Sequence, residues 1–260
     1  MNKTIINNDT ILKGENLSIY FGGLHAVENF NIDIKKKELV GLIGPNGAGK
    51  TTAFNLLTGV YKPTSGKIFL DGSDVTSLPP HLRVTKGIAR TFQNIRLFKK
   101  MSVLDNVKVA FNSNMKYSSL GAILRLKSFW KEEQEIDKKA KDILKVFDLN
   151  DVEEEYASNL PYGKQRKLEI ARAIATDPKI ILLDEPAAGM NPTETDELME
   201  TIKHIKDKFN ISILLIEHDM KLVMGICERI IVLNYGRIIA SGTPEQIKNN
   251  KEVITAYLGE

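Results

Sequence analysis

The sequence is poor in cysteine, and its charges nearly balance. A single cysteine, Cys227, excludes an internal disulfide, argues against a structural zinc site and fits a reducing compartment. We expect its side chain to be a small buried hydrophobe. There are 36 lysine and arginine residues against 33 aspartate and glutamate residues, and the net charge of +3 is too small to predict nucleic-acid or membrane binding by field alone.

Long apolar runs are also missing. No segment approaches the ~20 consecutive apolar residues that a membrane-spanning helix needs, and residues 1–17 lack the apolar centre of a signal peptide. We therefore expect a soluble chain that reaches a membrane only through a partner. The content of 42% hydrophobic and 27% charged residues predicts a globular protein with one large core and room for a satellite subdomain.

Several segments predict an α/β fold with a parallel sheet. Residues 38–57, "ELVGLIGPNGAGKTTAFNLL", combine a short apolar strand, a glycine-rich turn and a helix. The apolar runs "KIILLDE" (179–185) and "ISILLIEHD" (211–219) end in acidic residues, which is typical of central strands buried on both faces. "SGKIFLDG" (65–72) and "RIIVLNYGRIIASG" (229–242) predict further strands bounded by tight turns.

The stretch from about residue 101 to residue 159 has a different character. Strand signals fade there, and charged, helix-favouring segments such as "KSFWKEEQEIDKKAKDILKVFDL" (127–149) predominate. This pattern predicts a helical subdomain inserted into the α/β core, with the lysine and glutamate run of residues 131–155 on a solvated face. Residues 76–87 predict a loop that passes into a helical turn.

Residues 44–51, "GPNGAGKT", match the phosphate-binding pattern G-x-x-x-x-G-K-[ST]. In this pattern backbone N–H groups surround a β-phosphate, and the following helix presents its positive end. Lys50 is predicted to reach the β- and γ-phosphates, and the Thr51 hydroxyl is predicted to bind Mg²⁺. The alternative is a glycine-rich turn that merely joins strand to helix.

Two adjacent carboxylates, Asp184 and Glu185, end the strand predicted at residues 179–185. Asp184 is a candidate to hold the second coordination shell of the magnesium ion. Glu185 is a candidate to orient and deprotonate the attacking water, because the pleat of a strand sends neighbouring side chains to opposite sides. A solvated strand end is the structural alternative. The sequence has no guanine-reading Asn-Lys-x-Asp motif, which argues against a GTPase.

His218 and Gln93 are less specific candidates. His218 follows a predicted buried strand, where an imidazole could hydrogen-bond the γ-phosphate and hold the water. Gln93 is either an amide that reaches the metal and its water or an ordinary surface side chain, and spacing does not choose between these roles. For the other histidines, His25, His81 and His204, we expect structural roles.

Together these segments resemble the nucleotide-binding domain of an ATP-binding cassette (ABC) transporter over nearly the whole chain. The five family motifs occur in the family's order: the phosphate loop at Gly44–Thr51, a glutamine loop at Gln93, a signature at Leu160–Gln165, the acidic strand end at Asp184–Glu185 and a switch histidine at His218. "FGGLHAVENF", "FQNIRLFKKMSVLDNV", "LPYGKQRKLEIARA", "DEPAAGMNP", "IEHDMKLVMGI" and the ending "GTPEQIKNNKEVITAYLGE" are similar to the ATPase subunit of branched-chain amino-acid uptake systems.

The resemblance implies an α/β fold with a P-loop NTPase core, an ABC-type antiparallel β subdomain and an inserted helical subdomain. The implied boundaries are approximately 1–98 and 161–260 for the core with its β subdomain, and 99–160 for the helical subdomain. All of them belong to a single nucleotide-binding domain. The implied cofactors are ATP and Mg²⁺.

The resemblance also implies roles for individual residues. Catalytic roles fall to Lys50, Gln93, Glu185 and His218, and the implied metal ligands are Thr51, Gln93 and Asp184. An aromatic side chain stacks on the adenine; by position this is Phe21, with Tyr20 as the runner-up and a core aromatic as the alternative. The other residues that contact nucleotide are Gly44, Pro45, Asn46, Gly47, Ala48, Gly49, Lys50, Thr51 and Thr52 in the loop, and Leu160, Pro161, Tyr162, Gly163 and Lys164 in the signature.

The implied partners are a second ABC ATPase subunit in a head-to-tail homo- or heterodimer, permease subunits that dock near Gln93 and the helical subdomain, and, indirectly, an extracytoplasmic substrate-binding protein. Nucleic acid is not among them. The chain is expected on the cytoplasmic face of the membrane, where ATP-driven closing and opening of the dimer powers transport. The alternatives are an ATPase for urea or amide transport or for lipopolysaccharide export, and a soluble cassette ATPase acting on ribosomes or DNA.

Two residues depart from the family pattern. The usual signature is Leu-Ser-Gly-Gly-Gln, and Pro161 replaces the serine whose hydroxyl would donate to the γ-phosphate held by the other subunit. We expect Pro161 at the first helical position, with the N–H groups of Tyr162 and Gly163 free and Lys164 adding positive charge. Asn191 stands where the family often has aspartate, which bears on the coupling between the two sites of a dimer.

One lost hydrogen bond is worth about 0.5–1.5 kcal/mol, or about 1.5–3 kcal/mol when a charged group accepts it. The site completed by this signature is therefore predicted to be the weaker of two. The hypothesis implies a heterodimer in which the other ATPase subunit keeps the hydroxyl.

Overall fold

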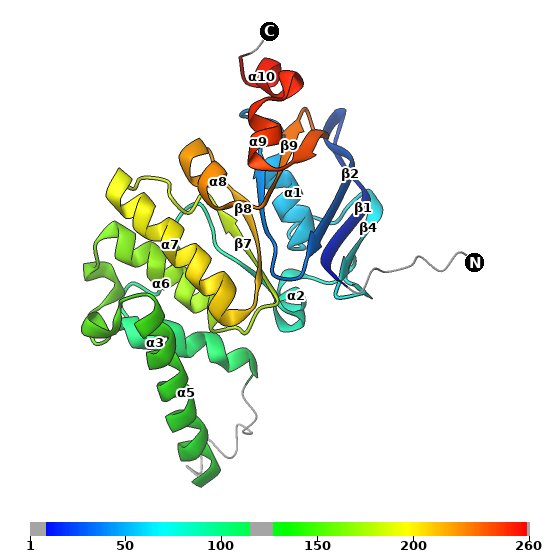
Figure 1. Ribbon diagram of the computed structural model, residues 1–260. Helices are drawn as coiled ribbons and strands as arrows, with labels where there is room; N and C mark the ends of the chain where they lie inside the picture. Colours follow the sequence, from blue (N-terminus) through cyan, green and yellow to red (C-terminus); the bar gives the residue numbers. More distant parts are fainter. Residues whose placement is uncertain (1–8, 115–126, 259–260) are drawn as a thin grey trace.

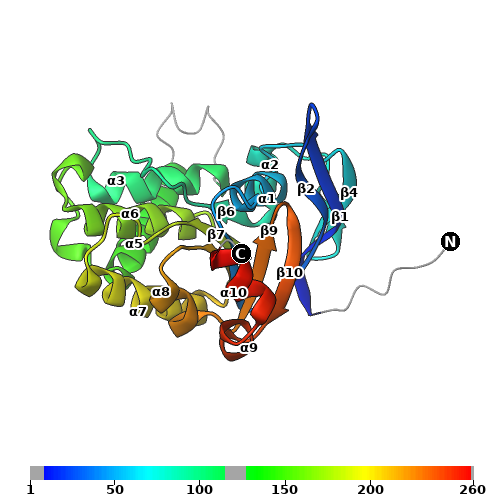
Figure 2. The same ribbon diagram turned by 90° about the horizontal axis from the view of Figure 1, so that it is seen from above.

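The computed structural model describes residues 9–114 and 127–258. It confirms the α/β fold class: a six-stranded sheet lies in the middle, a four-stranded sheet lies on one side, and most helices lie on the other (Figures 1 and 2). None of the helices in these two ranges combines the length and the apolar character that a bilayer-spanning helix needs.

The six-stranded sheet has the order β10-β9-β3-β8-β7-β6. All neighbouring strands run parallel except β9 and β10, which form an antiparallel pair. Strands β3, β7 and β8 are buried at every position, as their continuous apolar runs predict. The strands are β3 (Leu39–Ile43), β6 (Ile88–Arg90), β7 (Ile180–Asp184), β8 (Ser212–Ile216), β9 (Arg229–Asn234) and β10 (Arg237–Gly242).

The four-stranded sheet is antiparallel, with the order β2-β1-β4-β5. Its first two strands form a long hairpin, which is the antiparallel element expected near the N-terminus. The strands are β1 (Thr10–Phe21), β2 (Leu24–Lys35), β4 (Ser65–Leu70) and β5 (Ser73–Asp74).

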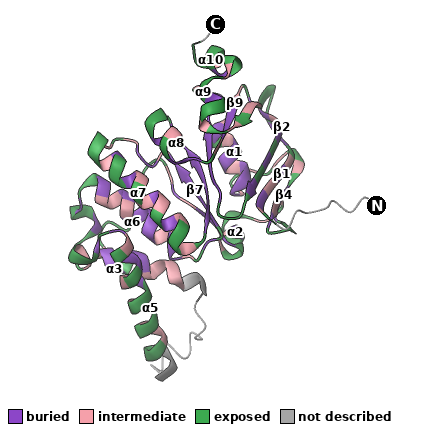
Figure 3. Ribbon diagram, viewed as in Figure 1, coloured by how far each residue is buried: buried purple, intermediate pink, exposed green. Residues whose placement is uncertain are grey.

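Hydrophobic side chains form two clusters, one on each face of the six-stranded sheet, because successive residues of a strand point to opposite faces. In β7, Leu183 joins the cluster shared with the helices, whereas Leu182 joins the cluster between the two sheets. Helix α1 (Lys50–Leu57) belongs to the second cluster through Phe54. Figure 3 shows buried residues along strands of both sheets.

The remaining helices are distributed around these layers. Helices α5, α6 and α7 lie on the side of the six-stranded sheet that faces away from the four-stranded sheet. Helices α9 and α10 lie near β9 and β10 (Figures 1 and 2). Their bounds are α2 (Pro80–Lys86), α3 (Val103–Lys108), α5 (Lys127–Val146), α6 (Tyr162–Ile174), α7 (Pro192–Phe209), α8 (Met220–Ile226), α9 (Pro244–Lys248) and α10 (Lys251–Leu258).

In its described part, the stretch between residues 101 and 159 contains α3, α5, three short 3-10 turns and one isolated bridge between Ser102 and Tyr156. This helical content agrees with the loss of strand signal in the sequence. Residues 115–126 lie outside the described ranges, as do residues 1–8 and 259–260 at the two ends. The subdomain boundaries at 98/99 and 160/161 stay predictions.

Two local features differ from the sequence-based expectation. Strand β6 is not predicted, because three residues between a loop and a polar segment give no periodic signal. Helix α6 begins at Tyr162, so Pro161 is the N-cap and not the first helical residue. The ψ of Pro161 is 154°, which is not helical, and the carbonyl of Pro161 accepts a hydrogen bond from the N–H of Gln165. Both features are typical of an N-cap.

Candidate functional site

The phosphate loop connects β3 to α1, and close backbone contacts require glycine in it. A Cβ on Gly44 would lie 2.0 Å from the carbonyl oxygen of Leu233 in β9. Gly49 has a φ of 100°, and a Cβ there would lie 2.6 Å from the carbonyl oxygen of Ala26 in β2. The loop is therefore packed against two neighbouring strands, and it leads into the N-terminus of α1.

Lys50, the first residue of α1, is buried and turned back on the loop. Its Nζ donates hydrogen bonds to the carbonyl oxygens of Gly44, at 2.7 Å, and Pro45, at 3.0 Å. Burial lowers the pKa of Lys50 below its usual value, and the negative charge of Glu185 partly opposes this shift. The ammonium group thus lies against the loop that carries the phosphate-binding pattern.

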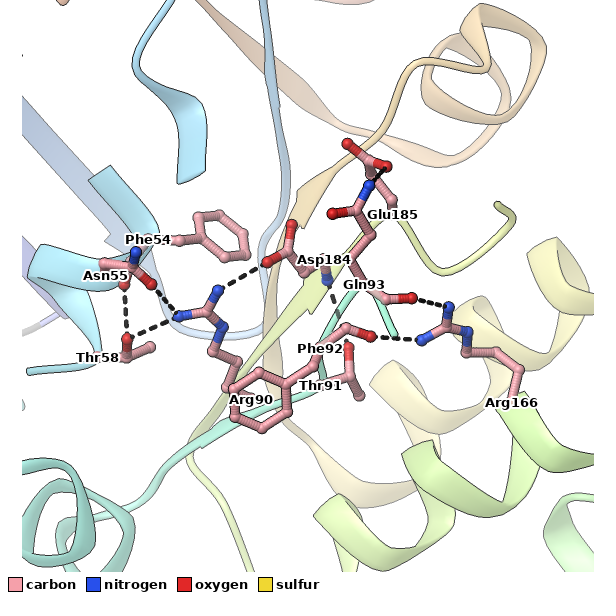
Figure 4. Close-up of polar contacts among 10 residues, drawn as sticks. All are labelled: Phe54, Asn55, Thr58, Arg90, Thr91, Phe92, Gln93, Arg166, Asp184 and Glu185. Atoms are coloured by element: carbon pink, nitrogen blue, oxygen red, sulfur yellow. Dashed lines mark hydrogen bonds and ion pairs between the residues drawn. The ribbon is translucent and has the colours of Figure 1, made fainter. Parts of the chain in front are cut away.

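Glu185 brings Gln93 and His218 together at the carboxyl ends of β6, β7 and β8. Its Oε2 accepts a hydrogen bond from Gln93 Nε2 at 2.8 Å (Figure 4), and its Oε1 lies 2.9 Å from His218 Nε2. Glu185 itself has a φ of 46°, so the chain turns sharply after β7. Ligands of parallel α/β sheets bind outside the carboxyl ends of the strands, and this cluster lies there.

Asp184 faces the mostly buried side chain of an arginine. Its Oδ2 forms an ion pair with Arg90 Nη2 at 2.7 Å. The same guanidinium donates hydrogen bonds through Nη1 to Asn55 Oδ1 at 2.6 Å and to Thr58 Oγ1 at 3.2 Å. Arg90 therefore connects the strand before Gln93, the strand that carries Asp184 and the helix that follows the phosphate loop (Figure 4).

A second buried carboxylate, Glu217, precedes His218. It accepts backbone hydrogen bonds from Ala187 at 2.7 Å, from His218 at 2.9 Å and from Asp219 at 3.3 Å. Burial raises the pKa of Glu217 above its usual value; the three N–H groups oppose the rise, and the charge of Glu185 adds to it. Glu217 therefore ties the loop after β7 to the loop that carries His218.

The signature lies at the start of α6. Leu160 is buried, whereas the side chains of Pro161 and Tyr162 are exposed, and Pro161 makes no side-chain cap hydrogen bond. Lys164 lies beside Asp151, with 3.6 Å between Nζ and Oδ2. Helix α6 packs on the face of the six-stranded sheet opposite to α1, so the signature and the phosphate loop belong to different faces.

Arg166 connects the signature helix to the Gln93 segment. It is fully buried and donates hydrogen bonds to the carbonyl oxygens of Phe92, at 2.7 Å, and Gln93, at 2.8 Å (Figure 4). It also forms an ion pair with Glu169 at 2.7 Å. A movement of the Gln93 backbone therefore acts directly on α6.

The two adenine candidates lie at the end of β1. Phe21 is 45% exposed and packs edge-on against Tyr61, with 5.4 Å between ring centroids. Tyr20 is 37% exposed and packs against His25, with 4.3 Å between centroids. Neither ring is buried in the core, so both offer surface to a base, and the preference for Phe21 stays a prediction.

The candidate magnesium ligands, Thr51, Gln93 and Asp184, offer a hydroxyl, an amide and a carboxylate. Mg²⁺ prefers oxygen ligands and is usually bound through one or two carboxylates together with substrate phosphates. In residues 9–114 and 127–258 no group of three or more His, Cys, Asp or Glu side chains could hold a metal ion. A donor set with a single carboxylate fits a metal ion that binds together with a nucleotide.

Asn191 is the N-cap of α7. Its Oδ1 accepts a hydrogen bond from the N–H of Glu194, and the Glu194 carboxylate accepts one from the N–H of Asn191, each at 3.0 Å. Asparagine and aspartate are about equally good N-caps. The departure from the family's aspartate therefore preserves the local structure and removes a negative charge.

Sequence reasoning missed Arg90, Arg166 and Glu217. A carboxylate directly before His218 at the end of an apolar run is visible in the sequence and could have been found. The arginines carry no such signal, because their contacts span 94 residues from Arg90 to Asp184 and 73 residues from Arg166 to Gln93.

Comparisons with known proteins agree with this geometry. The family model described as "ABC transporter" matches residues 27–188, and a second one, "Branched-chain amino acid ATP-binding cassette transporter", matches residues 237–260. The chain belongs to the ABC transporter ATPase family. It binds adenine nucleotide and hydrolyses ATP to power transport.

Individual relatives cover almost the whole chain. It is 50% identical over 250 residues to LivG of Escherichia coli (strain K12), a high-affinity branched-chain amino acid transport ATP-binding protein. The aligned region covers 96% of this chain and 98% of LivG. The ADP conformation of MJ1267, an ATP-binding cassette of an ABC transporter, superposes with a TM-score of 0.83 at 32% identity and covers 96% of this chain and 99% of MJ1267. A dimeric post-hydrolysis state of the cassette MJ0796, bound to ADP and Pi, superposes with a TM-score of 0.74 at 25% identity. The superposition covers 90% of this chain and 99% of the MJ0796 chain.

Proposed function

We propose that this chain is the ATP-hydrolysing subunit of a transporter that takes up branched-chain amino acids. The observation that carries the proposal is the 50% identity to LivG over nearly the full length of both chains. The match of residues 237–260 to the branched-chain family model supports it at the C-terminus. The same argument disfavours urea, amide or lipopolysaccharide transport and a role on ribosomes or DNA.

Each part of the site has a proposed role in hydrolysis. The backbone of the phosphate loop and Lys50 bind the ATP phosphates, and Thr51, Gln93 and Asp184 hold Mg²⁺, which neutralises phosphate charge when bound. Glu185 deprotonates the attacking water, and His218 orients the water and the γ-phosphate. The contacts of Glu185 with Gln93 and with His218 support this division, because they keep all three side chains within hydrogen-bond reach.

A second cassette subunit is proposed to complete the site. The signature and the phosphate loop belong to opposite faces of the sheet, which supports a head-to-tail arrangement in which each signature meets the nucleotide held by the other subunit. The dimeric structure of MJ0796 supports the presence of a second cassette subunit. Because Pro161 offers no donor, we place this signature in the weaker site of a heterodimer.

The permease is proposed to dock beside the Gln93 segment, which places the chain on the cytoplasmic face of the membrane; an extracytoplasmic binding protein would act only indirectly. A groove with apolar walls and basic side chains supports this docking site. Its lining includes Arg96, Leu97, Phe98, Arg172 and Ala173, together with the acidic Glu169. Phe98 leaves 48% of its surface exposed there.

Two experiments test the proposal. Glu185→Gln should bind ATP as the parent does and lower kcat by about 10²- to 10⁴-fold, because it removes the proposed general base. In proteoliposomes with the co-encoded permease and binding protein, the parent should drive ATP-dependent leucine, isoleucine or valine uptake, and Glu185→Gln should not. Hydrolysis that is stimulated only by urea, an amide or lipopolysaccharide would reject the proposed substrate and leave the ATPase assignment intact.

A further inference from the structure

We propose that Arg90 is a positioning residue of the ATPase site: it holds the carboxylate of Asp184 in place and lowers the affinity of the site for Mg²⁺. The inference rests on the proposed role of Asp184 in the magnesium site and extends it to a residue that contacts neither the water-activating cluster nor the phosphate loop itself.

The guanidinium of Arg90 is held at both ends. Nη2 binds Asp184 Oδ2 at 2.7 Å, and Nη1 binds Asn55 Oδ1 at 2.6 Å and Thr58 Oγ1 at 3.2 Å (Figure 4). A planar guanidinium fixed in this way fixes the orientation of the carboxylate that it binds. The ion pair of Arg90 uses the Oδ2 atom of Asp184 and does not include Oδ1.

The charges of this pair are shielded from water. The side chains of Arg90 and Asp184 are 10% and 6% exposed. The rings of Phe54 and Phe92 flank the guanidinium, with centroids 5.8 and 5.2 Å from its carbon atom. Arg90 Nε is buried and, within the described residues, has no hydrogen-bond partner. The carboxylate of Asp184 is therefore the main group that compensates the positive charge of Arg90.

A metal ion at Asp184 would meet the field of this arginine. Charges interact more strongly in a poorly solvated site than in water, so a guanidinium 2.7 Å from Oδ2 reduces the attraction of the carboxylate for a cation. Removal of the guanidinium leaves the Asp184 carboxylate buried without its ion-pair partner. Mg²⁺ then becomes the cation that compensates the negative charge of Asp184. Arg90 thus fixes the ligand and weakens its hold on the metal.

The position of Arg90 in the fold extends this effect. It ends β6, which pairs with β7 and leads through Thr91 and Phe92 to Gln93. Its other hydrogen bonds go to Asn55 in the last turn of α1, the helix that follows the phosphate loop, and to Thr58, the C-cap of this helix. One side chain therefore sets the relative position of the three elements that carry the phosphate loop, Asp184 and Gln93.

The test uses the full chain with Glu185→Gln, which prevents turnover during binding measurements. Binding of the fluorescent analogue TNP-ATP is titrated with Mg²⁺, which gives the half-saturating Mg²⁺ concentration of each variant. The Tm of each variant is measured separately in EDTA. Arg90→Gln should lower the half-saturating concentration by about threefold or more and also lower Tm. The matched control is Arg83→Gln. Arg83 is 1% exposed and donates to the carbonyl oxygens of Leu56 and Leu57 in α1, so its loss should lower Tm and leave the Mg²⁺ titration unchanged.

An unchanged or higher half-saturating concentration in Arg90→Gln would overturn the proposal, since a merely structural arginine predicts only the fall in Tm. If Arg90→Gln does not fold, Arg90→Lys keeps the positive charge beside Asp184 and loses the planar fork of donors. Its Tm should fall, and its half-saturating Mg²⁺ concentration should not fall by more than about twofold; a larger fall rejects the charge argument. Asp184→Asn separates the two hypotheses: if it leaves the Mg²⁺ titration unchanged, the proposed metal role of Asp184 fails, whatever Arg90 does.

Discussion

The phosphate loop and the signature helix both offer backbone N–H groups at a helix N-terminus, but the fold supports them in different ways. The loop is confined by the contacts of Gly44 and Gly49 with neighbouring strands, and Lys50 adds a buried charge. The signature starts at an exposed proline without a donor, and Arg166 connects its helix to the Gln93 segment. The loop is therefore preorganised by its own strands, whereas the signature depends on other segments and, in our proposal, on a second subunit.

Between these two regions lies a set of buried polar contacts. Arg90 joins α1 to Asp184, Arg166 joins α6 to the Gln93 backbone, and Glu217 joins the loops after β7 and β8. Such contacts have well-defined geometry, so a change at one of them should affect one side of the comparison more than the other.

Arg166→Met should affect the signature side more than the loop side. It leaves Glu169 buried without its ion-pair partner and removes the donor to the Phe92 and Gln93 carbonyls. Breaking a buried pair costs about 3–5 kcal/mol, so the free energy of unfolding in urea should fall by about that amount. ATP affinity of the surviving folded protein should stay within about twofold of the parent if the loop is independent.

The matched control is Lys167→Met on the same helix, whose partner Glu197 is largely exposed, so the unfolding free energy should change by less than about 1 kcal/mol. A large loss of ATP affinity in Arg166→Met would show that the phosphate loop depends on the signature helix and would erase the distinction between the two regions.

Lys50→Ala should affect the loop side alone. A hydrogen bond between charged groups is worth about 1.5–3 kcal/mol, which corresponds to a fall in ATP affinity of about 10- to 160-fold in calorimetric titration. The exposed Lys62 provides the control, and Lys62→Ala should bind ATP as the parent does. A fall of less than threefold in Lys50→Ala would mean that the backbone of the loop, without the ammonium, accounts for binding.

Asn191→Ala should cost about 1 kcal/mol of unfolding free energy, because it removes the N-cap of α7. Asn191→Asp keeps the cap, and its negative charge at a helix N-terminus should stabilise the protein by about 0.3–1 kcal/mol. Both values come from urea unfolding. A destabilising Asn191→Asp would indicate that this site selects asparagine for a reason other than capping.

Glu217 should give the protein a pH-dependent stability. Its pKa is raised in the folded state above its usual 4.5, so the folded state binds more protons than the unfolded state as pH rises from about 4.5 to the folded-state pKa. The unfolding free energy contributed by Glu217 therefore falls with rising pH in this window, by less than about 1.4 kcal/mol per pH unit.

Urea unfolding at a series of pH values checks this sign. Glu217→Gln should make the slope of unfolding free energy against pH less negative in the same window. Glu200→Gln, an equal change of charge on the exposed side of α7, provides the control. A slope that is the same in Glu217→Gln and in the parent would mean that the folded protein does not protonate this carboxylate.

The two regions also differ in how far the sequence predicts them. The phosphate loop is encoded by consecutive residues, and the apolar runs that become β7 and β8 are buried on both faces, so motif and periodicity were sufficient. The start of α6 is displaced by one residue from the expectation, because Pro161 fits both the N-cap and the first helical position by sequence. Arg90 and Arg166 could not be predicted, because their partners are set by tertiary contacts alone.

ATP-dependent dimerisation of Glu185→Gln, followed by light scattering, tests the central claim most directly. The chain alone should stay monomeric with ATP, and it should dimerise when mixed with a co-encoded cassette ATPase that keeps the signature serine. Pro161→Ser added to Glu185→Gln should then allow the chain to dimerise by itself, because it restores one donor worth about 1.5–3 kcal/mol to a charged phosphate. A stable homodimer of Glu185→Gln with Pro161 in place would contradict the claim that this signature completes the weaker of two sites.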